Sequence, residues 1–311
     1  MRKTWADIAI PETGIAQGDM PGDQIQIGGT HIQKAGLLMP MLLEKLPPIF
    51  EKTSHERAVI SVYGGSGVGK SEIASLITYY LGHEGIGSYT LSGDNYPLRI
   101  PKDNDAERLR VFQRGGMRGL LASGQYTDDR GQQLRQWQED GQDAEPALCR
   151  DADWLSTYQE QGRMALKAYL GTPNEIDFSE VSQIISAFKN GAERIMLKRM
   201  GRAVTDLWYD SVDFSGVKVL VIEWTHGNSD YLQGVDYRIF LNSTPQETLV
   251  HRMSRQRDGN ADGAFTTMVL GIEQKLLDTQ SGRADVIVSK NGGMLSRQEY
   301  RALMLREGAG Q

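Results

Sequence analysis

Hydrophobic and polar positions near the start of the chain predict a strand, a helix and a second strand in succession. Residues 58–63 (AVISVY) form a β-branched apolar run that ends at two glycines, a pattern typical of a buried strand. Residues 71–81 place apolar side chains at helical spacing, and residues 88–92 form a second strand-like run after a glycine-rich turn. This succession is the building block of a parallel sheet covered by helices.

The same pattern continues after a long polar interruption. Apolar runs predict further strands, and helical spacing predicts further helices; the strands are 217–224, 235–241 and 284–289, and the helices are 34–52, 177–189, 244–257 and 262–278. Pro40 lies near the start of the first of these helices, and Pro47 and Pro48 are expected to disturb its end. Residues 24–27 alternate and are a candidate short edge strand.

These elements predict an α/β protein with a doubly wound parallel sheet and an inserted helical lobe. Residues 103–170 are polar and helix-like and interrupt the alternation of strand and helix, so we interpret them as an inserted lobe or lid. The expected organisation is an N-terminal extension and helix (1–54), a core (55–102 and 171–295), the inserted lobe (103–170) and a C-terminal tail (296–311).

Composition narrows the function classes. The 311 residues carry a net charge of −6, which speaks against a polynucleotide-binding protein. The single cysteine, Cys149, offers neither an intramolecular disulfide nor a metal framework. There is no signal-peptide pattern and no apolar run long enough to cross a bilayer, so we expect a cytoplasmic protein without a membrane partner.

One segment carries a specific chemical signature. Residues 64–71, GGSGVGKS, match the G-x-x-x-x-G-K-[ST] pattern between a predicted strand and a predicted helix, which is the context that the phosphate-binding P-loop requires. Glycines allow consecutive backbone N–H groups to cradle phosphates, Lys70 reaches the β- and γ-phosphates, and Ser71 binds Mg²⁺. The expected nucleotide-binding residues are Gly64, Gly65, Ser66, Gly67, Val68, Gly69, Lys70 and Ser71.

The P-loop alone does not distinguish a kinase from a motor ATPase or a GTPase. An Asn-Lys-x-Asp base-reading motif is absent, and the D-x-x-G pattern at 213–216 precedes its strand rather than following it, as an ordinary turn would. A small-molecule kinase needs in addition an acid that orients the acceptor hydroxyl, an acid near the metal and cations over the phosphates.

The sequence offers candidates for each role. Asp94 follows the second strand and would accept the hydroxyl proton. Glu223 ends the 217–224 strand, where a Walker B acid holds Mg²⁺, and His226 would line the acceptor pocket. Three arginines on a predicted helix would stabilise the phosphates, Arg252 and Arg255 as catalytic cations and Arg257 toward the nucleotide.

With these residues identified, the chain resembles the uridine kinase and phosphoribulokinase family of P-loop kinases. The resemblance rests on the P-loop and on the order of further segments, namely 92–96 (SGDNY), 172–178 (TPNEIDF), 221–223 (VIE), 235–241 and 284–288. It implies ATP and Mg²⁺ as cofactors, Asp94 as the acceptor-orienting acid, Glu223 beside the metal, and lid arginines at Arg252 and Arg255.

The chain departs from this family in ways that bear on the acceptor. Trp224 stands where the family has glycine, and residues 195–202 replace a Tyr-Asp and His-x-Arg segment. The cations Arg99, Lys102, Arg199 and Arg202, together with Tyr96, are candidate acceptor-binding residues, which favours an acceptor with a carboxylate or phosphate, or a polar sugar. Two alternatives stay open, a nucleotide-dependent regulatory protein and a nucleic-acid ATPase; the oligomeric state is not readable from the sequence.

Overall fold

The computed structural model describes residues 5, 8–11, 14–243, 247–248 and 263–308. The chain divides into two compact units. The first comprises residues 1–96, 177–244 and 277–311, and the second comprises 97–176 and 245–276. No helix among the described residues is long and apolar enough to span a membrane.

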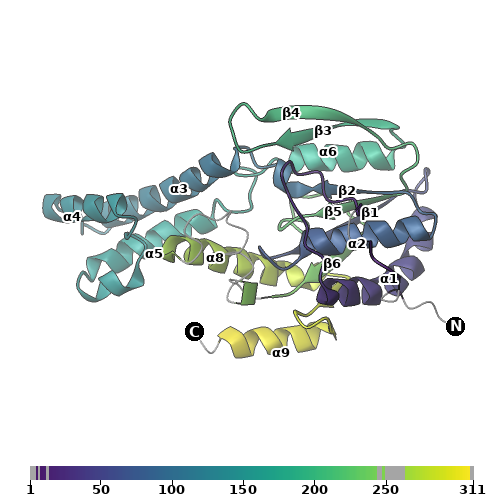
Figure 1. The fold of residues 1–311 in the computed structure, drawn as a ribbon. Coiled ribbons are helices and arrows are strands. Elements are labelled where there is room, and N and C mark those ends of the chain that lie inside the picture. Colours follow the sequence, from purple (N-terminus) through teal and green to yellow (C-terminus); the bar gives the residue numbers. More distant parts are fainter. Residues whose placement is uncertain (1–4, 6–7, 12–13, 244–246, 249–262, 309–311) are drawn as a thin grey trace. The chain divides into compact units, whose positions relative to one another are not determined.

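The first unit is built on a six-stranded sheet in the order β2-β5-β1-β6-β7-β8 (Figure 1). Its strands are β1 (Ala58–Gly64), β2 (Ser88–Ser92), β5 (Val219–Glu223), β6 (Tyr237–Leu241), β7 (Val286–Val288) and β8 (Met294–Leu295). All neighbours run parallel except β7 and β8. Every residue of β1 and β5 is buried, which explains why these strands are continuous apolar runs.

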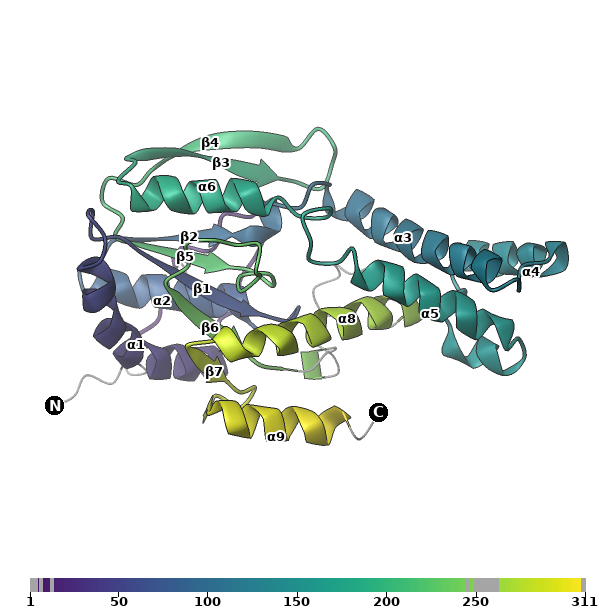
Figure 2. The ribbon, with the colours of Figure 1, turned by 180° about the vertical axis from the view of Figure 1, so that it is seen from behind.

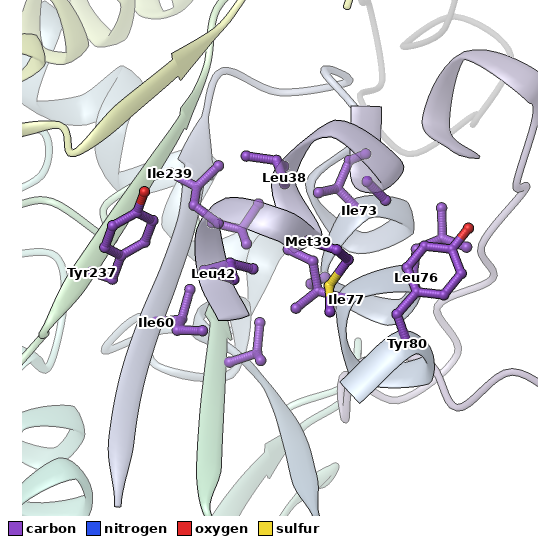
Figure 3. Packing of buried hydrophobic residues seen from close by; sticks show 14 of the residues in the cluster. Leu38, Met39, Leu42, Ile60, Ile73, Leu76, Ile77, Tyr80, Tyr237 and Ile239 are labelled. Carbon is purple, nitrogen blue, oxygen red and sulfur yellow. The ribbon is translucent and has the colours of Figure 1, made fainter. Parts of the chain in front are cut away.

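One face of this sheet is covered by α1 (Gly29–Phe50) and α2 (Lys70–His83). Figure 3 shows Leu38, Met39 and Leu42 of α1 among side chains of α2 and of the sheet, in a cluster of buried residues. α1 begins earlier than its sequence pattern predicts and runs through Pro47 and Pro48 to Phe50, because its buried apolar stripe holds it on the sheet.

The opposite face carries α6 (Phe178–Lys189), α9 (Arg297–Gly308) and the last turn of α8 (Ala264–Gln280) (Figure 2). A second cluster forms there from Tyr63, Phe240, Ile287 and Tyr300 together with Leu277 and Ala284. Helices on both faces confirm the predicted doubly wound α/β sheet. β8 lies at the end of the predicted core, whereas α9 lies in the segment that the sequence predicted only as a tail.

The structure differs from the sequence predictions at residues 24–27 and at residues 194–213. Residues 24–27 form no strand. The basic stretch at 195–202 belongs to a two-stranded antiparallel hairpin of β3 (Arg194–Met200) and β4 (Leu207–Asp213) that the pattern did not reveal. β4 is exposed along almost its whole length, so it lacks the half-buried alternation by which a strand is recognised in a sequence.

The second unit is helical. It contains α3 (Pro101–Ala122), α4 (Asp128–Glu139), the 3₁₀ helix η3 (Pro146–Arg150), α5 (Trp154–Lys167) and most of α8. Gly116 of α3 and Gly162 of α5 allow a close approach, because a Cβ at either would lie within 2.7 Å of the facing aromatic ring. The buried Glu175 accepts hydrogen bonds from Asn104 (3.1 Å) and Arg108 (2.6 Å), which tie its loop to α3.

Candidate active site

The phosphate loop occupies the turn between β1 and α2. Gly67 and Gly69 adopt φ angles of 76° and 94°, the left-handed region in which glycine is favoured. Gly64 is fixed by space, since a Cβ there would lie 2.4 Å from the Leu241 carbonyl oxygen. The strand–loop–helix context predicted for the motif is therefore present, with α2 starting at Lys70.

Lys70 and Ser71 of the motif already form hydrogen bonds within the protein. The Nζ atom of Lys70 donates a hydrogen bond to the Gly65 carbonyl, 3.0 Å away. The Ser71 hydroxyl donates to Oε2 of Glu223 at 3.1 Å. The P-loop and the strand-end acid, which are 152 positions apart in sequence, are thus in direct contact.

Glu223 is held between the strands on either side of it. In the parallel register it lies opposite Val62 of β1 and Ser92 of β2, and the Ser92 hydroxyl donates to its Oε1 at 2.5 Å. Burial raises the pKa of this carboxyl to about 8, and the nearby charge of Asp94 acts in the same direction. Hydrogen bonds from both serines and the charge of Lys70 oppose that rise only in part.

These groups fit a magnesium ion. Mg²⁺ prefers hard oxygen ligands and keeps several waters, so one or two protein oxygens suffice to hold it beside substrate phosphates. The Ser71 hydroxyl and the Glu223 carboxylate are such ligands on adjoining segments. The raised pKa of Glu223 is consistent with a cation site. Burial opposes the charged carboxylate, and a cation beside it would favour that charged form.

Asp94 lies in a 3₁₀ turn, η2 (Gly93–Asn95), that directly follows β2. Its side chain is exposed, as an acid that meets an incoming hydroxyl must be. The buried indole of Trp224 packs against Gly93, where an added Cβ would lie 1.9 Å from the ring. Trp224, a departure from the resembled family, therefore supports the turn that carries Asp94.

Tyr96 and His226 are both buried. Tyr96 is fully inaccessible, and its phenolic oxygen has no hydrogen-bond partner among the described residues. Burial raises its pKa, so the phenol stays neutral. His226 is 6% exposed and packs edge-on against Phe178 and Trp224. Their assignment to the acceptor pocket stays a prediction.

The four cations expected near the acceptor lie in different surroundings. Arg199 is buried on β3 and forms ion pairs with Asp19 (2.9 Å) and Asp210 (3.0 Å). Arg202 is exposed in the turn after β3. Arg99 and Lys102 belong to the second unit, where Arg99 donates to the Tyr169 hydroxyl at 3.1 Å. The predicted catalytic and nucleotide-binding arginines, Arg252, Arg255 and Arg257, lie outside the described residues.

Sequence reasoning missed the N-terminal contribution to this site. A Cβ added to Gly18 would lie 3.3 Å from Oε1 of Glu223, and the Asp19 carboxylate is hydrogen-bonded to residues around Asp94. No local signal could have found them, because residues 14–23 have no periodic pattern and match no motif. Ser92 could have been noticed as a polar residue at the end of a buried strand.

The chain is similar to a curated protein and to several solved structures. No protein-family model matches the chain. Over 269 residues, 86% of the chain, it is 37% identical to the bifunctional alpha-galactosidase/sucrose kinase AgaSK of Mediterraneibacter gnavus, and the match spans 23% of that protein. The chain thus corresponds to about a quarter of the length of this relative.

Three solved structures are similar at low identity. They are a putative fructose transport system kinase from a Silicibacter species (TM-score 0.44, 16% identity, 78% of this chain and 94% of that chain), a possible uridine kinase from Bacillus stearothermophilus (0.41, 13%, 79% and 98%) and D-glycerate 3-kinase from Cryptococcus neoformans (0.46, 12%, 87% and 99%). The resemblance to kinases is confirmed by the curated relative, and the first unit has the P-loop α/β fold that the sequence predicts.

Proposed function

We propose that this protein is an ATP- and Mg²⁺-dependent kinase that transfers the γ-phosphate to a hydroxyl group of a carbohydrate. The observation that carries the proposal is the contact of Ser71 in the P-loop with Glu223, with Asp94 displayed on the adjoining turn. This edge of the sheet combines a phosphate cradle, a metal-side acid and an exposed acid for the acceptor, the set that a small-molecule kinase needs.

Two observations support a neutral carbohydrate as the acceptor. The relative that is 37% identical over most of the chain is named for two activities, and its sucrose kinase activity is the one that would use a P-loop. In addition, Arg199 is paired with two carboxylates, so its charge is already balanced and offers little attraction to an anionic acceptor. We place the reaction in the cytoplasm, where ATP is supplied, and propose no nucleic-acid partner.

Each residue has a physical role in this reaction. Backbone N–H groups of the loop and Lys70 neutralise the phosphate oxygens, with Lys70 leaving the Gly65 carbonyl when nucleotide binds. Ser71 and Glu223 would hold Mg²⁺, which supplies positive charge beside the β- and γ-phosphates. Asp94 takes the hydroxyl proton as the acceptor oxygen bonds to phosphorus and the bond to ADP breaks.

The experiment that tests this proposal measures ADP release from Mg·ATP with and without pools of sugars, disaccharides, sugar phosphates, nucleosides and hydroxy acids. We expect a neutral sugar pool to accelerate release. Lys70→Ala and Asp94→Asn should each lower the acceptor-dependent rate by about a hundredfold or more, the worth of a phosphate-stabilising cation or a general base.

Matched controls exclude general damage. Lys45→Ala and Asp129→Asn make the same chemical changes at exposed positions and should leave the rate unchanged. Acceleration by anionic acceptors alone would overturn the neutral carbohydrate. Nucleotide binding without turnover on any pool would overturn the kinase and favour the nucleotide-dependent regulatory protein.

A further inference from the structure

The N-terminal segment, whose described residues before α1 are 5, 8–11 and 14–28, packs against the nucleotide-binding core. Trp5 packs its ring 5.6 Å from that of Tyr80, and the Tyr79 hydroxyl donates to the Ala9 carbonyl at 3.1 Å. Further on, the segment passes Glu223 at Gly18 and returns to the P-loop, where an added Cβ on Gly69 would lie 2.8 Å from Nε2 of His31. The described residues of this part of the chain therefore pack against the end of α2 and contact the site at Gly18 and His31.

Asp19 makes the densest of these contacts. Its Oδ1 accepts hydrogen bonds from the Ser92 backbone N–H (2.7 Å) and the Asn95 side-chain amide (3.1 Å). Its Oδ2 accepts from the Tyr89 hydroxyl (2.9 Å) and from Arg199 (2.9 Å). The side chain is only 8% exposed, so this is a buried carboxylate with four donors.

Two of these donors flank Asp94, the proposed acceptor-orienting acid, in the sequence. Ser92 and Asn95 stand on either side of Asp94, and Asp19 holds both through a single oxygen atom. The Asn95 side chain continues the connection, because its carbonyl oxygen accepts from the Met200 backbone N–H at 3.0 Å. The Ser92 hydroxyl in turn donates to Glu223. Movement of Asp19 would therefore shift the Asp94 turn and the support of the metal-side acid together.

We propose that Asp19 is a positioning residue for phosphoryl transfer, which fixes the turn bearing Asp94 and so makes the N-terminal segment part of the catalytic machinery. This inference rests on the proposed kinase function. Burial of its charge opposes folding, and the four hydrogen bonds that offset this opposition hold Asp19 to β2, to Arg199 and to both sides of the Asp94 turn.

The test compares Asp19→Asn with the same change at Asp23, four residues further along the segment. Asparagine has nearly the same volume as aspartate, but its NH₂ group cannot accept a hydrogen bond. It would therefore face two of the four donors that now bond to Asp19. We expect ADP affinity to stay close to wild type and the melting temperature to fall, because the amide leaves buried donors around position 19 unpaired. The kcat with acceptor should fall by about tenfold to a hundredfold, as expected for a small displacement of a reacting group. Asp23→Asn should match wild type.

A double-mutant cycle separates positioning from general weakening. If Asp19 acts through Asp94, Asp19→Asn has no further effect on kcat in an Asp94→Asn background. Equal fold losses in both backgrounds, or a wild-type kcat for Asp19→Asn, would overturn the proposal. Should Asp19→Asn fail to fold, Asn95→Ala cuts the same connection and carries the same expectation.

Hydrogen exchange keeps this inference distinct from the kinase proposal. In Asp19→Asn the amides of residues 92–96 and of Met200 should exchange faster than in wild type, with exchange in β1 unchanged. If wild type shows no acceptor-dependent turnover, the proposed function fails and exchange alone decides whether Asp19 holds the turn. Unchanged exchange at 92–96 would overturn the inference whatever the activity.

Discussion

Glu223 illustrates at the scale of one residue how the site depends on burial. The side chain is 3% exposed and sits between two serine hydroxyls, and burial raises its pKa to about 8. An acid at the end of an apolar strand was recognisable in the sequence as a metal-side candidate. Its contact with Ser92 was not, because only the parallel register of β2 and β5 places the two side by side.

Gly93 allows a sharp test at the same scale. Gly93→Ala would drive a methyl group into the Trp224 indole, 1.9 Å from the nearest ring atom, so we expect the free energy of unfolding to fall by about 1–3 kcal/mol. Acceptor-dependent turnover should fall as well, since Asp94 is the next residue. Urea unfolding followed by fluorescence measures the first effect.

The control for this change is Gly82→Ala in α2. A Cβ there meets no atom within 4 Å, and alanine is the better helix former, so stability should be unchanged or rise by up to about 1 kcal/mol. A Gly93→Ala protein as stable and active as wild type would show that Trp224 does not fix the turn.

At the scale of elements, tertiary contacts override local preference. α1 contains three prolines, each unfavourable in a helix interior, and yet the helix runs unbroken from Gly29 to Phe50. Its buried residues Leu38, Leu42 and Leu46 recur at helical spacing and lie on the sheet. In the second unit, α3 and α5 approach each other closely at Gly116 and Gly162, where no larger side chain would fit.

Asp143 in the second unit gives a pH-dependent prediction for stability. It is 2% exposed, and burial raises its pKa above the ordinary 3.8, although Tyr158 and Gln113 donate hydrogen bonds to it. The folded protein therefore holds this proton to a higher pH than the unfolded chain, and stability falls as pH rises from 3.8 through the raised pKa. Above that range the cost of the buried charge is complete.

Asp143→Asn removes the charge and keeps an oxygen that accepts both hydrogen bonds. We expect the melting temperature of the variant, relative to wild type, to be higher at about pH 7.5 than at about pH 4, which lies at the start of the range in which stability falls. Asp140→Asn, at an exposed position nearby, should differ from wild type equally at both pH values. A pH-independent effect of Asp143→Asn would contradict the assignment of a buried charge.

At the scale of the whole molecule, the two units have separate hydrophobic clusters, and the P-loop belongs to the first. Ligand that binds only the folded state stabilises it by about 2.7 kcal/mol at a hundredfold excess over Kd. Mg·ADP should therefore raise the unfolding midpoint of the first unit.

Tryptophan positions make this measurable. In a Trp137→Phe/Trp154→Phe variant the remaining tryptophans, Trp5, Trp208 and Trp224, all report on the first unit. Its fluorescence midpoint should rise with Mg·ADP, whereas adding Lys70→Ala should abolish the rise at the same concentration. A midpoint that ignores nucleotide would place nucleotide binding elsewhere or nowhere.

The sequence by itself determined the features that depend on local order. Strand, loop and helix around residues 58–81 follow from contiguous apolar periodicity and from glycines with a lysine and a serine. Asp94 was found because it follows the second strand, and Glu223 because it ends an apolar strand. The helix-like character predicted for residues 103–170 agrees with α3, α4 and α5.

Only the tertiary structure decided the rest. Strand β4 carries no burial pattern, and one of the two acidic partners of Arg199 is Asp19, 180 positions away. The N-terminal segment reaches the site because Asp19 accepts hydrogen bonds from Ser92 and Asn95 at the carboxyl edge of the sheet. Local sequence does not encode such meetings, because they arise when parallel register and burial bring distant donors to one carboxylate.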